Sequence, residues 1–171
     1  MGFYDSAMPI IRPAQPADLP AILEIYNEAV VATTASWAIE PVTLADRQAW
    51  LARQSAADHP VLTVEEDGCV VGFASYGPFR PQGGYAQTVE HSIYIKSGHR
   101  AAGLGRLLLG TLIDSARSNG VHAMVGVIDG ANAESVAFHE RMGFQVSGRL
   151  PEVGRKFGRW LDVVFVTRIL A

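Results

Sequence analysis

The chain has 171 residues, of which 49% are hydrophobic and 18% charged, with a formal net charge of −3. These values are typical of a globular protein, so we expect a single domain over residues 1–171, with 1–8 as a candidate flexible leader. The slight negative charge argues against a protein that binds nucleic acids or membrane surfaces, because the binding surfaces of such proteins are basic. One cysteine excludes a disulfide framework and suits the reducing cytoplasm. No apolar run approaches the roughly 20 residues of a membrane span.

Apolar periodicity, turns and caps predict strands and helices in alternation. In chain order they are a strand at 10–15, a helix after Asp18, a polar and aromatic loop at 33–43, a helix at 44–56, two strands within 60–79, a flexible turn at 80–85, a strand at 87–96, a helix from Gly103 to the turn at 119–120, a strand at 123–128, a helix at 132–143, and two strands around 144–148 and 160–170. The long helix has a predicted buried face of Leu104, Leu107, Leu108, Leu112, Ile113 and Ala116. This order predicts a mixed α/β sheet with helices on both faces, not a doubly wound fold.

The stretch HRAAGLGR, residues 99–106, joins a strand to the long helix. Glycines let successive N–H groups curl around one anion, and the helix dipole adds positive charge at the same point. A P-loop is excluded because no Gly-Lys-Ser/Thr triplet follows, and Leu108 stands where a dinucleotide fingerprint needs its third glycine. The predicted anion site therefore consists of Arg100, Ala101, Ala102, Gly103, Leu104, Gly105 and Arg106.

The pattern Arg-x-x-Gly-x-Gly resembles the signature (Gln/Arg)-x-x-Gly-x-(Gly/Ala) of the GNAT superfamily of N-acyltransferases. The resemblance implies a twisted, mostly antiparallel mixed sheet of about six or seven strands with about four helices. It also implies acetyl-CoA as cosubstrate, with its diphosphate on the glycine loop. The backbone of Ile93, Tyr94 and Ile95, on a splayed strand, would pair with the pantetheine arm. Asn132 and Ser135 would contact the cofactor, and His139 would lie near the thioester sulfur.

Glu90 is the candidate general base, because an amine must lose a proton before it can attack a thioester. In the strand TVEHSIYI, Glu90 shares one face with Ser92 and Tyr94, whereas His91 lies on the other face. An acidic residue inside an apolar strand needs a partner or a task. An ion pair on a solvated face remains the alternative interpretation.

His139 occupies the position where many members of the superfamily carry a tyrosine general acid. A thiol has a pKa near 8.5, so its thiolate is a tolerable leaving group and an imidazole can serve. A packing or helix-surface histidine is the open alternative. The remaining histidines are scattered without metal-ligand spacing, so no metal site is expected.

Three segments, 33–43, 77–95 and 153–165, resemble the phosphinothricin and methionine sulfoximine N-acetyltransferases. This resemblance runs over nearly the whole chain and implies acetylation of the α-amine of a small amino acid, in a homodimer. Arg80 would bind the α-carboxylate, and Lys156 would reach the polar head group, either in its own subunit or in a second one. The implied substrate-binding residues are Trp37, Phe79, Arg80, Gln82, Gly83, Tyr85, Glu90, His91, Ser92 and Lys156.

Two other functions remain open at this point. A protein N-terminal or lysine acetyltransferase would need an open groove, whereas the aromatic loops favour a closed pocket. A catalytically silent acyl-CoA sensor would not need Glu90.

Overall fold

The computed structural model describes residues 8–100 and 103–170. Ala101 and Ala102 of the glycine loop, and residues 1–7 of the candidate leader, lie outside the described residues. The described strands are β1 (Ile10–Pro13), β2 (Val61–Glu66), β3 (Cys69–Pro78), β4 (Thr88–Ile95), β5 (Ala123–Asp129), β6 (Gln145–Lys156) and β7 (Arg159–Ile169). The helices are α1 (Leu19–Ala32), α2 (Leu44–Ala56), α3 (Leu104–Ser118) and α4 (Ala133–Arg141), with short 3-10 turns η1 (Pro16–Asp18) and η2 (Gly83–Tyr85).

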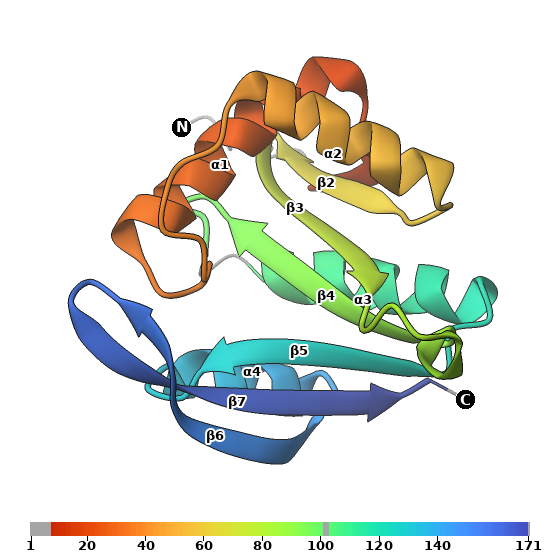
Figure 1. Cartoon of the computed structure of the whole chain (residues 1–171). Coiled ribbons are helices and arrows are strands. Elements are labelled where there is room, and N and C mark those ends of the chain that lie inside the picture. Colours follow the sequence, from red (N-terminus) through yellow and green to blue (C-terminus); the bar gives the residue numbers. More distant parts are fainter. Residues whose placement is uncertain (1–7, 101–102, 171) are drawn as a thin grey trace, which may run out of the picture.

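The strands form one seven-stranded sheet in the order β1-β2-β3-β4-β5-β7-β6 (Figure 1). Neighbouring strands are antiparallel except β4 and β5, which are parallel. On β3, Phe73 packs against α1 whereas its neighbour Ala74 belongs to the cluster that includes α3, so these helices cover opposite faces. The predicted mixed sheet with helices on both faces is confirmed. Among the described residues, none of the helices has the length and apolar character needed to cross a membrane.

The buried face of α3 differs from the predicted one at a single position. Leu107 is 48% exposed, and Leu109 is fully buried instead. With about 100° between successive residues, Leu107 lies on the far side of the stripe formed by the other apolar positions. The prediction for Leu107 was therefore wrong, because Leu107 to Leu109 are consecutive leucines and cannot all face inward.

The last two strands form a hairpin that is longer than predicted. β6 has 12 residues, not the few around 144–148, and its pairing with β7 shifts register twice. Pro151 and Glu152 lie between the shifted segments, and Glu152 has a positive φ of 55°. Irregular backbone at these residues hides the alternation that marks a regular strand.

The sheet opens between β4 and β5. Their ladder covers only Thr88 to Glu90 of β4, whereas β3 pairs with β4 as far as Ile95. β5 continues along β7 to Asp129. Beyond Glu90, therefore, β4 has an edge that no strand of the described chain pairs with, as the resemblance implied.

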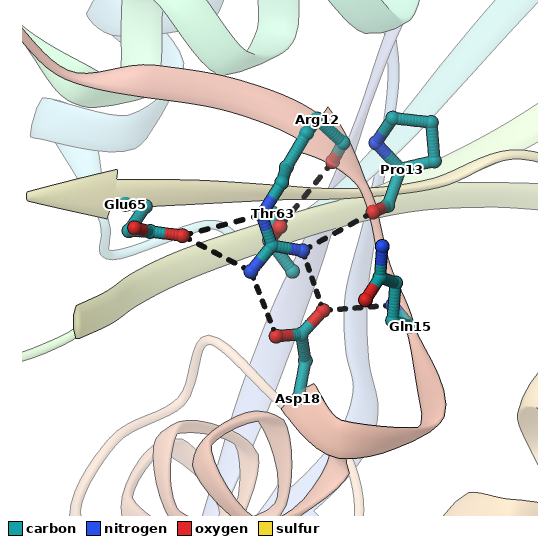
Figure 2. A network of polar contacts seen from close by, with 6 residues as sticks. All are labelled: Arg12, Pro13, Gln15, Asp18, Thr63 and Glu65. Atoms are coloured by element: carbon teal, nitrogen blue, oxygen red, sulfur yellow. Dashed lines mark hydrogen bonds and ion pairs between the residues drawn. The ribbon is translucent and has the colours of Figure 1, made fainter. Parts of the chain in front are cut away.

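An ionic cluster ties β1 and β2 to the start of α1 (Figure 2). The Arg12 guanidinium pairs with the Asp18 carboxylate at 2.7 Å and with the Glu65 carboxylate at 3.0 Å. Asp18 also accepts a hydrogen bond from the backbone N–H of Gln15 at 2.7 Å. The Arg12 hydrogen bonds hold the pKa of the Asp18 carboxyl below its usual value. This cluster fixes where α1 begins.

Candidate active site

Two cavities adjoin where β4 and β5 separate. The inner cavity, of about 290 Å³, lies between the loop at 34–38, β4 and the end of β5. The outer cavity, of about 320 Å³, follows β4 from Ile93 to Ile95 and is bounded by α1 and α4. Residues that line both are Thr34, Ala35, Ile93, Tyr94, Asn132 and Ser135. A ligand in the outer cavity can therefore present one end to the inner cavity.

The glycine loop forms a cationic hollow beside the outer cavity. Its lining of Arg100, Gly103, Gly105, Arg106, Phe138, Arg141 and Met142 brings three guanidinium-bearing residues together. Gly103 has a left-handed φ of 74° and is the N-cap of α3, and the first N–H groups of a helix point toward this end and can bind an anion. The hollow suits a polyphosphate group.

Asn132 and Ser135 sit at the first turn of α4, as predicted. The side-chain oxygen of Asn132 accepts a hydrogen bond from the Ser135 N–H at 3.0 Å, which caps the helix. Because both residues line both cavities, this cap forms the seam between them.

Glu90 is half-buried in the wall of the inner cavity together with Ser92 and Tyr94. Burial raises the pKa of the Glu90 carboxyl, and the nearby charge of Arg80 opposes this rise. Within residues 8–100 and 103–170, no side chain forms a hydrogen bond or ion pair with this carboxylate. A partly desolvated carboxylate that is free of ion pairs is a suitable proton acceptor.

His91 and His139 meet in the same wall. Their Nε2 atoms are 3.0 Å apart, and each Nδ1 faces a backbone carbonyl oxygen. Both line the inner cavity, although His91 lies on the β4 face opposite to Glu90.

Lys156 binds the loop that covers the inner cavity. Its side chain is buried, and Nζ donates hydrogen bonds to the carbonyl oxygens of Thr33 at 2.7 Å and Ser36 at 2.6 Å. It lines neither cavity. On the same hairpin, a Cβ at Gly154 would lie 2.2 Å from the Trp37 ring, so only glycine allows this ring to pack there. Trp37 lines the inner cavity, and its buried Nε1 has no hydrogen-bond partner among the described residues.

The segment at 79–85 lies outside the lining of both cavities. Arg80 stacks on Phe79 with 4.3 Å between the guanidinium carbon and the ring centroid, and it donates to the Phe79 carbonyl oxygen at 2.9 Å. Tyr85 makes an edge contact with Phe79, and Gln82, Gly83 and Tyr85 are exposed. The charge of Arg80 therefore affects the pKa of Glu90, but the side chains of residues 79–85 do not line the inner cavity.

Sequence reasoning missed several lining residues. Tyr26 enters the inner cavity from α1 and Asp129 from the end of β5. The Thr34 hydroxyl donates to the Asp129 carboxylate at 2.6 Å, which ties the covering loop to β5. The only signal for Asp129 in the sequence is its place after a buried strand, where polar side chains often gather.

A family model for the acetyltransferase (GNAT) domain matches residues 11–165 of the chain. The chain belongs to the GNAT acetyltransferase family. A methionine sulfoximine and methionine sulfone acetyltransferase of Pseudomonas aeruginosa is 50% identical over 157 residues, which cover 91% of each chain. The GNAT fold is also shared with solved structures. A phosphinothricin acetyltransferase of Sinorhizobium meliloti in complex with acetyl-CoA has a TM-score of 0.92 and 34% identity, covering 95% of this chain and 89% of that one.

A structure described as a ribosomal-protein-alanine N-acetyltransferase from Brucella melitensis is also similar. Its TM-score is 0.92 and its identity 48%, over 94% of this chain and 99% of that one. Membership of the GNAT family, together with these relatives, makes the chain an acetyltransferase enzyme. The names of these relatives give different acceptors of the acetyl group. The geometry of the inner cavity must therefore decide which acceptor this enzyme takes.

Proposed function

We propose that this enzyme transfers acetyl from acetyl-CoA to the α-amine of small amino acids such as methionine sulfoximine, methionine sulfone or phosphinothricin. The observation that carries the proposal is the free, partly desolvated Glu90 carboxylate in a small inner cavity that adjoins the outer one. The names of two similar proteins support the choice of acceptors. Such an enzyme serves to inactivate toxic amino-acid analogues, herbicides included.

The residues of the hollow and the outer cavity fit coenzyme A. Arg100, Arg106 and the first N–H groups of α3 would hold the diphosphate, and Leu104 begins that turn. The unpaired edge from Ile93 to Ile95 would hold the pantetheine arm as an added strand would be held. When bound, acetyl-CoA supplies an acyl group activated as a thioester.

Glu90 removes a proton from the acceptor amine, which then attacks directly. The raised pKa of Glu90 makes it a stronger base than an exposed carboxylate. Trp37 and Tyr94 wall the cavity. Arg80 is the cation whose charge acts on Glu90, and it would attract the α-carboxylate of the amino-acid substrate. Lys156 acts through the covering loop.

Thiol release from acetyl-CoA, measured against a panel of acceptors, tests this function. The panel holds methionine sulfoximine, methionine sulfone, phosphinothricin, ordinary amino acids, an alanine-terminated peptide of ribosomal-protein type and a lysine peptide. We expect the free amino-acid analogues to have the highest kcat/KM, because a cavity of about 290 Å³ has the size of a small-molecule site, whereas a peptide would leave most of its chain outside it. Preference for either peptide would replace this proposal with a protein acetyltransferase.

We also propose a cytoplasmic homodimer that joins at the β6–β7 hairpin. Exposed apolar side chains concentrate on this hairpin, namely Val146, Leu150, Val153, Phe157, Trp160 and Ile169. Light scattering after size-exclusion chromatography should give a mass of about twice the 18.4 kDa of the chain. Replacing Val153 and Trp160 by lysine should shift the protein to monomer, whereas a parent that is monomeric at all concentrations would contradict the proposal. The exposed, unpaired Cys69 suits a reducing compartment.

A further inference from the structure

Two buried histidines from different elements form a closed chain of contacts in the wall of the inner cavity. The Nε2 atoms of His91 on β4 and His139 on α4 are 3.0 Å apart. The His91 Nδ1 lies 2.9 Å from the Val125 carbonyl oxygen, and the His139 Nδ1 lies 2.7 Å from the Ser135 carbonyl oxygen. The two residues are 6% and 4% exposed, so bulk water does not replace these contacts.

The number of protons in this chain follows from the chemistry of its atoms. Carbonyl oxygens only accept, so each Nδ1 needs a proton, and the facing Nε2 atoms need one between them. Two neutral imidazoles carry one N–H proton each and leave one contact without a proton. One added proton completes all of the contacts, and a second would place two N–H groups head to head. The geometry therefore fits one extra proton on the pair.

The surroundings keep the pair neutral at rest. The Phe144 ring lies 5.2 Å from the His91 ring and 5.4 Å from the His139 ring, measured between centroids. A Cβ at Gly126 would lie 2.8 Å from His91 Cε1, so glycine there makes room for the ring. Burial lowers the pKa of His91 to about 3 and lowers the pKa of His139 as well.

The titratable groups near the pair come from its neighbouring elements. Glu90 and Tyr94 of β4 and Asp129 of β5 line the same cavity, and α4 brings Glu134 and Arg141 to the outer cavity. On the β7 side, Val166 packs at Gly126 beside His91. The two imidazoles are within hydrogen-bond distance of each other, and after burial the neighbouring His139 is the next cause that lowers the pKa of His91.

We propose that His91 and His139 accept one proton as a pair during acetyl transfer, with His139 as the catalytic group and His91 as its positioning and proton-sharing partner. This inference rests on the proposed function. An ammonium acceptor has three N–H bonds and the amide product has one, so two protons must leave the nitrogen. Glu90 takes one and returns it to solvent.

The histidine pair takes the other proton as an N–H bond of the acceptor breaks and an N–H bond of the pair forms. The pair then passes this proton to the sulfur as the carbon–sulfur bond breaks and an S–H bond forms. Protons and charge balance, and the pair returns to its neutral state.

Histidine titration in the free protein tests the pair without any turnover. The full chain, labelled with ¹⁵N-histidine, is followed by NMR from neutral pH down to acid unfolding. We expect the rings of His91 and His139 to titrate with one common midpoint, below the ordinary pKa of a histidine of about 6.5. In His91→Phe, His139 should titrate alone with a different midpoint. Separate midpoints in the parent, or no proton uptake before unfolding, would overturn the proposal.

Kinetics then separate proton sharing from ring placement. His91→Phe fills the space without a ring nitrogen, and we expect it to lower kcat about tenfold or more while the KM for acetyl-CoA stays within about twofold. The glutamine of His91→Gln can donate an amide N–H to the His139 Nε2 but cannot carry the proton. Compared with His91→Phe, this variant should recover the thermal unfolding midpoint of the parent but not its kcat. His122→Gln, on the surface, is the matched control.

Full recovery of kcat in His91→Gln would reduce His91 to a purely structural role and overturn proton sharing. A parent that acetylates no acceptor would refute the proposed function, whereas the NMR titration would still decide the pairing.

Discussion

At the scale of single residues, the proposed chemistry depends most on Glu90. Replacing it by glutamine keeps the shape of the cavity but removes the proton acceptor. We expect Glu90→Gln to lower kcat about a hundredfold near neutral pH, with little change in the KM for acetyl-CoA. Because burial raises the pKa of Glu90, the activity of the parent should fall as the pH drops through that raised value. Steady-state kinetics across pH measure both effects, and equal turnover by parent and variant at every pH would rule out Glu90 as base.

The sequence predicted residues whose role follows from their own strand or loop. Glu90, Ser92 and Tyr94 share a face because strand residues alternate, and the structure places all three at the inner cavity. Arg141 and Asp129 escaped prediction because folding carries them to the site from elements whose local pattern is ordinary. Lys156 was predicted to reach the substrate because it is a cation close to an aromatic segment in the sequence. Nothing in the local sequence indicates that it binds carbonyl oxygens about 120 residues away.

At the scale of elements, the start of α3 depends on the left-handed backbone of Gly103. A Cβ at this position would meet no atom of the described residues within 4 Å, so a side chain would be disfavoured by the φ of 74° and not by crowding. We expect Gly103→Val to weaken acetyl-CoA binding at least about tenfold, because the first-turn amides lose their alignment. Isothermal titration calorimetry checks this, with Gly110→Ala in the middle of the same helix as control. Unchanged affinity would contradict the assigned diphosphate site.

The covering loop depends on the β6–β7 hairpin through Lys156. Lys156→Met keeps most of the length of the side chain but removes the donors to Thr33 and Ser36, so residues 36–38 lose their fixed place at the inner cavity. We expect the KM for the amino acid to rise about tenfold and the KM for acetyl-CoA to change less. Lys96→Met, at a partly exposed lysine paired with Glu24, is the control. A variant with parental KM for both substrates would show that the loop holds itself in place.

Element order and type could be read from the sequence because apolar periodicity and caps are local signals. Thr43 and Asp46 form a reciprocal cap at the start of α2, which begins at Leu44 as predicted. The splay and the extent of β6 depend on pairing between distant strands, which local patterns do not encode. For the splay, only the resemblance to a known family supplied the expectation.

At the scale of the whole molecule, the cluster of Arg12, Asp18 and Glu65 links the first strand to the rest of the sheet (Figure 2). Asp18→Asn should lower the free energy of unfolding by about 2 kcal/mol at neutral pH, because it removes charge-assisted hydrogen bonds from a nearly buried site. The folded pKa of Asp18 is depressed, so its contribution is present above the unfolded pKa of about 4 and is lost as the pH falls through the folded value.

Urea unfolding at neutral and acidic pH measures this contribution. The difference in the free energy of unfolding between the parent and Asp18→Asn should disappear as the pH is lowered. A difference that stays constant with pH would show that the ion pair does not stabilise the fold.

The central claim is that α3 holds the coenzyme A diphosphate while Glu90 meets the acceptor amine across the splayed strands. A crystal structure with coenzyme A and methionine sulfoximine tests it most directly. We predict the diphosphate on the first-turn amides of α3 beside Arg100 and Arg106, and the α-amine within about 3 Å of the Glu90 carboxylate, or one water away. A diphosphate bound elsewhere, or an amine out of reach of Glu90, would contradict this claim.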